Sequence, residues 1–266
     1  MKAIITALVL FLFTGGPAGA SVQDRLKDGG NAVVLEVVDG DTVVLDRKIE
    51  GANQVRLVGL QAPKLPLGRN GFRMWPLAPQ SKTALEALTL GRAVNLRYGG
   101  AEKDRHGRLL AHLFLEDGTW VQGQMLQIGM ARVYTFPDNR AVAADMHRHE
   151  QAARDAERGI WAHPFYKIRA AAPEALKRYT GTFQIIEGKV IDAVRVKSRV
   201  YLNFGEDWRS DFTVTLNSRA RKMFKSSGIE PLDYKNKTIR VRSWLKKYNG
   251  PAIDATHPEQ IEIVGQ

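Results

Sequence analysis

The sequence contains no cysteine among its 266 residues. This absence excludes disulfide bonds, thiolate nucleophiles and cysteine-based zinc sites, so the fold must be stabilised by packing alone. Long apolar runs are also scarce, and the clearest one, at 3–13, follows Lys2 and precedes the small residues at 18–20. This pattern is typical of a secretory signal peptide and is too short to span a bilayer. We therefore expect cleavage of 1–20, no stable membrane insertion, and an exported protein that is periplasmic or secreted.

Acidic residues are few: 28 Asp and Glu stand against 39 Lys and Arg, which gives a formal charge of +11. An excess of this size favours polyanions, either nucleic acid or another anionic polymer, through counterion release. Charge alone does not choose between them, and nothing in the sequence indicates an oligomeric state.

The order of elements predicts two domains. Strands are expected at 33–64, 94–98 and 109–115, and helices at 81–90, 120–130 and 141–158. This order favours a β-barrel with helices packed on it (α+β), as in an OB-fold. We place the first domain at 21–168 and an alanine-rich linker with one proline at 169–178. The strands and one helix that follow repeat the order, so 179–266 should form a second, small OB-like β-barrel domain.

The stretch Val33–Lys64 carries the clearest chemical signal. Its first half enters and leaves an Asp-Gly-Asp turn, which predicts a hairpin with Asp41 where a strand leaves the turn. Its second half begins near Arg56 and ends in Gln61-Ala62-Pro63-Lys64. A carboxylate, a guanidinium and several polar tips should therefore converge.

Residues 33–161 resemble the staphylococcal nuclease (thermonuclease) family through four segments in the right order: VVDGDTVVL, VRLVGLQAP, DRHGRLLAHLF and EQAARDAERGIW. Members of that family hydrolyse phosphodiester bonds in DNA and RNA with one calcium ion. The resemblance aligns Asp41 with the first calcium ligand, and Arg56 and Arg108 with the two arginines that clamp the phosphate. These three are our candidate catalytic residues. The structural alternative is that Asp41 only closes a turn and that the arginines are ordinary barrel-end residues paired with Asp41 or Asp104.

Two positions depart from the family pattern. The family has a calcium-binding aspartate where this chain has Gln61, and a water-orienting glutamate where it has Lys64. The Gln61 carbonyl is a neutral ligand, so calcium would be held only weakly, by Asp41 and Gln61. An ammonium at Lys64 repels a divalent cation and does not accept a proton from water at its ordinary pKa. Phosphate binding should survive these changes better than hydrolysis.

Further basic residues near the proposed site are candidates for substrate binding: Lys64, Arg69, Arg73 and Arg105. Trp75 lies on the same loop as Arg69 and Arg73, and together they are suited to stacking on or steering a strand; packing within the loop is the equal alternative. His147 and His149 are two apart on a predicted helix and point in different directions, which argues against a shared metal and favours a solvated face.

These patterns leave three functions open. The leading one is an exported thermonuclease-family protein that binds DNA or RNA and, if it hydrolyses them, does so with weakly held calcium. The alternative is a catalytically inactive module of the cell envelope that binds nucleic acid or another anionic polymer. A third is a protein-interaction module whose basic surface only confers solubility.

Overall fold

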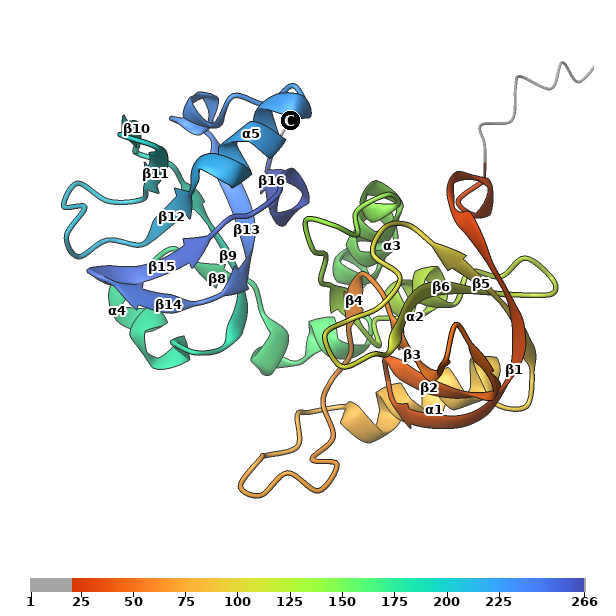
Figure 1. The fold of residues 1–266 in the computed structure, drawn as a ribbon. Helices are drawn as coiled ribbons and strands as arrows, with labels where there is room; N and C mark the ends of the chain where they lie inside the picture. Colours follow the sequence, from red (N-terminus) through yellow and green to blue (C-terminus); the bar gives the residue numbers. More distant parts are fainter. Residues whose placement is uncertain (1–20, 266) are drawn as a thin grey trace, which may run out of the picture.

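The computed structural model describes residues 21–265, so the predicted signal peptide at 1–20 lies outside the described residues. The chain forms a helix-covered β-barrel followed by a second β-rich part, and the two lie side by side (Figure 1). Within residues 21–265, no helix is long and apolar enough to cross a membrane.

The barrel is a closed ring of five strands, as predicted. The strands, in ring order, are β1 (Lys27–Asp39), β2 (Thr42–Ile49), β3 (Ala52–Leu57), β6 (Leu109–Leu115) and β5 (Ala93–Tyr98). Strands β3 and β6 run parallel, and the other neighbours run antiparallel. Alternate residues of β5 are buried, which is the period of two expected for a strand with one face in a core. The tight β1–β2 hairpin places Asp41 at one end of this ring.

Three helices cover the barrel, close to where the sequence predicted them: α1 (Ala78–Thr89), α2 (Val121–Gln127) and α3 (Ala143–Asp155). The turn between β1 and β2 packs tightly on α1. A Cβ atom at Gly40 would lie 2.0 Å from Ser81 Oγ and 2.7 Å from the Ala62 Cβ, so only glycine permits this approach. The contact fixes the turn, and with it Asp41, against the helix.

A short sheet connects the barrel to its helices. Strand β4 (Leu60–Gln61) pairs antiparallel with β7 (Arg132–Val133), so that Gln61 faces Arg132. Between β4 and α1 the chain runs without helix or strand, as the prolines and glycines of this segment predicted. This segment forms the long orange loop at the bottom of Figure 1.

The C-terminal part is a second small β-rich unit with its own hydrophobic core, as predicted. Its strands form two separate sheets. Among the described residues, only the five strands of the barrel close into a ring. The five-stranded sheet contains, in order, β10 (Asp192–Val196), β11 (Arg199–Asn203), β12 (Thr213–Leu216), β15 (Gly250–Asp254) and β14 (Lys246–Tyr248). The four-stranded sheet contains β16 (Ile261–Ile263), β13 (Thr238–Trp244), β9 (Phe183–Lys189) and β8 (Arg169–Ala170).

The helices of this part are α4 (Pro173–Leu176) and α5 (Ser218–Ser226). The predicted long strand at 183–196 is divided, because β9 and β10 belong to different sheets. Strand β8 and helix α4 occupy residues of the predicted linker, and Leu176 is buried in the C-terminal core. The predicted domain boundaries stay a prediction.

Candidate functional site

Asp41 lies at the end of the β1–β2 turn and is fully buried, with 0% of its surface exposed. Its backbone N–H donates to Asp39 Oδ1 at 3.1 Å, which stabilises the turn locally. The Ala62 N–H donates to Asp41 Oδ2 at 2.8 Å, so the carboxylate also ties the segment after β4 to the hairpin. A buried carboxylate of this kind requires cationic partners.

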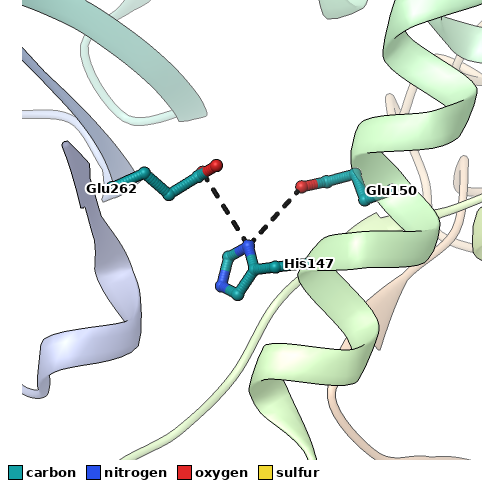
Figure 2. A group of neighbouring side chains, drawn as sticks. All are labelled: His147, Glu150 and Glu262. Atoms are coloured by element: carbon teal, nitrogen blue, oxygen red, sulfur yellow. Dashed lines mark ion pairs between the residues drawn. The ribbon is translucent and has the colours of Figure 1, made fainter. Parts of the chain in front are cut away.

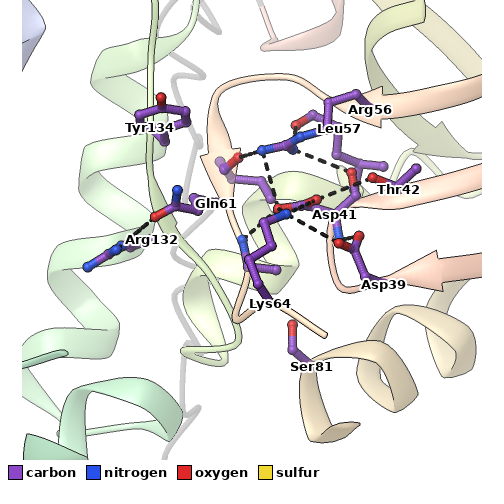
Figure 3. A network of polar contacts seen from close by, with 12 residues as sticks. Asp39, Asp41, Thr42, Arg56, Leu57, Gln61, Lys64, Ser81, Arg132 and Tyr134 are labelled. Carbon is purple, nitrogen blue, oxygen red and sulfur yellow. Dashed lines mark hydrogen bonds and ion pairs between the residues drawn. The ribbon is translucent and has the colours of Figure 1, made fainter. Parts of the chain in front are cut away.

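Lys64 supplies the first of these partners (Figure 3). Its Nζ atom lies 2.6 Å from each carboxylate oxygen of Asp41 and 3.3 Å from Asp39 Oδ2. The ammonium group therefore sits between the two carboxylates, and its side chain is 19% exposed.

Arg56 supplies the second. Its Nη2 atom lies 3.2 Å from Asp41 Oδ2 and donates to the Leu60 carbonyl at 2.8 Å, while Nη1 donates to the Leu57 carbonyl at 2.7 Å. The convergence of Arg56 with Asp41 follows from the pairing of β2 with β3, where Thr42 lies opposite Arg56. These contacts anchor the guanidinium firmly at the barrel end.

The two carboxylates differ in acidity. Burial alone would raise the pKa of Asp41, but the charges of Arg56 and Lys64 outweigh it and hold that pKa well below its usual range. The pKa of Asp39 is raised, first by burial and then by the neighbouring Asp41 charge. Asp41 is thus the charged centre of the cluster.

The residues present do not fit a calcium ion. Calcium needs six to eight oxygen ligands, several of them charged. Both Asp41 oxygens face Lys64 instead, within hydrogen-bond distance. The Gln61 carbonyl accepts from Arg132 Nε at 3.0 Å and from Nη2 at 2.7 Å, so it too is turned to a cation (Figure 3). The sequence predicted Asp41 and Gln61 as the oxygen ligands of a weak metal site. In the structure, the oxygen atoms of both side chains face ammonium or guanidinium groups instead.

A cavity of about 450 Å³ opens beside this cluster, and we call it the barrel-end cavity. Arg56 and Arg108 both line it, so the two arginines aligned with the family's phosphate clamp share one cavity. Asp104 Oδ2 accepts from Arg108 Nε at 2.8 Å, and the Arg108 side chain is 29% exposed. The pairs Arg56 with Asp41 and Arg108 with Asp104 are those that the structural alternative anticipated.

The remaining predicted substrate-binding residues lie in three different places. Arg105 is exposed and lines the barrel-end cavity, with its Nε atom 3.1 Å from His106 Nε2. Arg69 is exposed on the long loop, donates to the Pro66 carbonyl at 2.9 Å and covers the Phe72 ring at 3.8 Å. Arg73 lines a different cavity at the junction of the two parts.

Sequence reasoning missed Arg132, which is 3% exposed and lies beside Gln61. Its signal was a charged residue within the apolar segment MARVY, between predicted helices. It also missed Tyr134, whose ring lines the barrel-end cavity and packs edge-on against Phe183 at 5.0 Å. That contact joins the barrel to β9. Local sequence patterns do not predict it, because the two residues are far apart in the chain.

A second polar cluster lies between α3 and the C-terminal part. His147 Nδ1 is 3.9 Å from Glu150 Oε2 and 3.8 Å from Glu262 Oε1 (Figure 2). The prediction that His147 lies on a solvated helix face is wrong. Its side chain is 16% exposed and faces the C-terminal part. Arg242 Nη1 lies 2.7 Å from Glu150 Oε2, and Arg154 Nη2 lies 2.9 Å from Glu262 Oε2. These guanidiniums already balance the carboxylates, so the group is an ion-pair network and not a metal centre.

Comparison with known proteins agrees with this geometry. Residues 54–163 match the family described as staphylococcal nuclease homologue. An uncharacterized endonuclease of Escherichia coli is 30% identical over 155 residues, which are 58% of this chain and 86% of the relative. The thermonuclease of Staphylococcus intermedius is 26% identical over 163 residues, 60% of this chain and 92% of that protein. Endonuclease YhcR of Bacillus subtilis is 29% identical over 164 residues, 56% of this chain and 13% of that protein.

The barrel with its paired arginines is thus of the thermonuclease type. This chain belongs to the staphylococcal nuclease family. The family match includes Arg56, Gln61, Lys64 and Arg108, but it begins after Asp41 and ends before the C-terminal part.

Proposed function

We propose that this protein binds the phosphodiester chain of nucleic acid in the barrel-end cavity, without needing calcium, and lacks the calcium-dependent hydrolysis of its family. The membership in a nuclease family and the basic charge of +11 support nucleic acid as the ligand. The alternative polyanions of the cell envelope remain outcomes of the test below.

One observation carries the proposal: the Lys64 ammonium lies 2.6 Å from both oxygens of Asp41. In the family's reaction the metal ion is held at this carboxylate, and a glutamate at the position of Lys64 orients water. Here a positive side chain occupies the second position and neutralises the first. This chain therefore lacks both a carboxylate free to bind the metal ion and a carboxylate to activate water, and the family's hydrolysis requires both.

Phosphate binding requires fewer functional groups than hydrolysis. A phosphate group requires guanidinium and ammonium donors and a positive field, and the barrel-end cavity has Arg56, Arg105 and Arg108 along its lining. Arg108 keeps its Nη1 atom clear of the bond with Asp104, which uses Nε and Nη2. We assign Arg108 as the main phosphate donor, with Arg56 contributing charge from the cavity wall.

We also propose that the protein is exported. The pattern at residues 1–20 supports export to the periplasm or the medium. An exported protein of this kind meets DNA or RNA released from cells.

The test uses the full mature chain with fluorescently labelled single-stranded and double-stranded DNA and RNA, in calcium and in chelator. We expect salt-sensitive binding that is equal in both conditions, with no cleavage. Calcium-dependent cleavage that disappears in Asp41→Ala and Arg108→Ala variants would overturn the proposal. A failure to bind at low salt would exclude nucleic acid and direct the same assay to anionic polysaccharide.

Variants then locate the binding site. Arg108→Gln should weaken binding of every sequence roughly equally and lower the salt slope by about 1, as expected for the loss of one phosphate contact. Arg195→Gln is the matched control, because Arg195 is an exposed arginine of β10 whose Nε donates only to the Lys197 carbonyl. Equal losses in both variants would show that general charge, and not the cavity, is responsible.

A further inference from the structure

We infer that a second cavity, at the junction of the two parts, is a nucleotide-binding subsite that takes a phosphate together with a flat base. This junction cavity has a volume of about 540 Å³. It lies between the long loop of the barrel part and the start of β9, and it shares no lining residue with the barrel-end cavity. The inference deepens the proposed function and rests on it only for the claim that the ligand is part of a nucleic acid.

The charge of this cavity is entirely positive. Three arginines line it, Arg73, Arg132 and Arg169, and no acidic residue does. Within residues 21–265 none of the three has a carboxylate within ion-pair distance. Buried charges are ordinarily paired, so a cavity lined by unpaired guanidiniums calls for an anion.

Of the three arginines, Arg132 is the most deeply buried. It is 3% exposed, and its hydrogen-bond acceptor is the neutral Gln61 amide. Burial lowers its pKa to about 10, so the group still carries its charge at neutral pH. The guanidinium lies over the rings of Phe183 at 4.4 Å and Trp75 at 5.7 Å. Ring faces offset part of the cost of burial but supply no counter-charge.

Arg169 is held in a similar way on the other side. Its Nε atom donates to Gln184 Oε1 at 2.8 Å, and its guanidinium covers the Tyr179 ring at 3.7 Å. Arg73 is exposed, lines the cavity and forms no hydrogen bond within the described chain. Arg132 and Arg169 are thus each held by partners in both parts of the chain, and Arg73 has no side-chain partner among the described residues.

The walls carry flat aromatic rings. The aromatic residues that line the cavity are Phe72, Trp75, Phe165, Tyr179 and Phe183. Trp75 is fixed by a hydrogen bond from its backbone N–H to the Lys64 carbonyl at 3.0 Å and packs on Phe165 at 5.6 Å. Bases of any sequence stack on such rings, and guanidiniums bind the phosphate. The volume lies within the usual range for small-molecule sites.

The two cavities are neighbours. Tyr134 lines the barrel-end cavity, Phe183 lines the junction cavity, and their rings meet edge-on at 5.0 Å. A strand bound at Arg108 can therefore continue over this aromatic pair, with the next nucleotides at Arg132 and Arg169.

The experiment is isothermal titration of the full mature chain with adenosine 5′-monophosphate, adenosine and inorganic phosphate. We expect the nucleotide to bind more tightly than either fragment. Arg169→Gln should weaken it roughly tenfold and the exposed Arg73→Gln roughly threefold. Arg195→Gln should change nothing, and thermal unfolding of each variant controls for folding, with Arg73→Gln the least able to disturb it.

Each outcome decides one of the two proposals. Absence of nucleotide binding, or a loss confined to Arg108→Gln, overturns the junction subsite and leaves binding at the barrel end intact. Inorganic phosphate that binds as tightly as the nucleotide also overturns it, since the rings would then contribute nothing. Oligonucleotides that fail to bind at all, while the mononucleotide binds, contradict the proposed function and leave the junction site standing.

Discussion

Gln61 accepts two hydrogen bonds from Arg132, at 3.0 Å from Nε and 2.7 Å from Nη2. At the position where the family has a metal-binding carboxylate, this chain has a neutral group that serves an arginine. The same substitution that weakens a metal site leaves Arg132, beside the junction cavity, without a carboxylate within ion-pair distance among the described residues.

The first prediction concerns this pair. Gln61→Glu keeps the length of the side chain and would pair Arg132 with a carboxylate. Because the guanidinium would then be neutralised, we expect affinity for adenosine 5′-monophosphate to fall roughly tenfold, with stability unchanged or higher. Titration measures the affinity, and Gln80→Glu, at an exposed position of α1, is the control for added negative charge. An affinity that stays the same would show that Arg132 does not contact the ligand.

The second prediction concerns stability. Lys64→Gln removes the closest cation of the buried Asp41 and leaves it with Arg56. Because Lys64 is partly exposed, we expect a loss of about 2 kcal/mol in the free energy of unfolding, measured in urea. Lys82→Gln removes the same charge from a surface pair with Glu86, where the N–O distance is 3.7 Å, and should cost less than about 0.5 kcal/mol. Equal losses would mean that the Lys64 pair is no more than a surface contact.

The third prediction concerns calcium. Lys64→Glu would bring a third carboxylate next to Asp39 and Asp41, so millimolar calcium should raise the thermal midpoint of this variant and not that of the natural protein. Adding Gln61→Asp should increase the effect only slightly, because Arg132 competes for the new carboxylate. Thermal unfolding in calcium and in chelator measures both. Strong stabilisation of the natural protein by calcium would contradict the ion pairing described for Lys64.

The fourth prediction concerns pH. Burial lowers the pKa of His112 to about 3 and the pKa values of His147 and His257 to about 4. Each is below the unfolded value of about 6.5, so the stability from the neutral rings is complete above pH 6.5 and is lost as the pH falls through 4 toward 3. We expect the thermal midpoint to fall over this window. Asp41, whose pKa is lowered, loses its contribution only at still lower pH.

His257 offers the sharpest variant for that prediction. Its Nε2 atom lies 2.7 Å from Thr135 Oγ1, and its Nδ1 atom lies 2.9 Å from Thr256 Oγ1. His257→Gln retains polar contacts but does not titrate, so the midpoint should depend less steeply on pH between 6.5 and 4. The exposed His106→Gln is the control. A dependence that is as steep as in the natural protein would assign the effect to other groups.

The fifth prediction concerns the junction of the two parts. Arg242 is 2% exposed and binds Glu150 and Glu262. Arg242→Met leaves Glu150, which is fully buried, without its nearest cation, and we expect a loss of about 3 kcal/mol or more. Lys246→Gln breaks a half-exposed pair with Asp254 and should cost little. Chemical unfolding measures both, and a small effect of Arg242→Met would show that Arg154 suffices as a partner.

The sequence predicted the barrel and the meeting of Asp41 with Arg56, because both depend on short-range pairing. The Asp-Gly-Asp turn sets the hairpin, and β2 then lies beside β3. It did not predict the partner of Gln61, because β4 pairs with a strand about 70 residues away in the chain, in a sheet of only two strands. Patterns of apolar residues carry no information on which short strands meet.

In the C-terminal part, the same limit applied to the long strand expected at 183–196. Both β9 and β10 have strand-like composition, but the chain crosses from one sheet to the other between them. The sequence therefore predicted one strand where the structure has two, because the division into two sheets depends on how the core is shared among distant residues.

The ammonium of Lys64 is attached to the chain, and this gives the site a property that a bound ion does not have. A dissociable cation occupies its carboxylate in proportion to its concentration outside the protein, and it adds stability only to that extent. A tethered cation is present at full occupancy as soon as the chain folds, because its encounter with Asp41 is intramolecular. The charge balance at the barrel end is therefore set by the sequence and does not depend on the concentration of metal ions in solution.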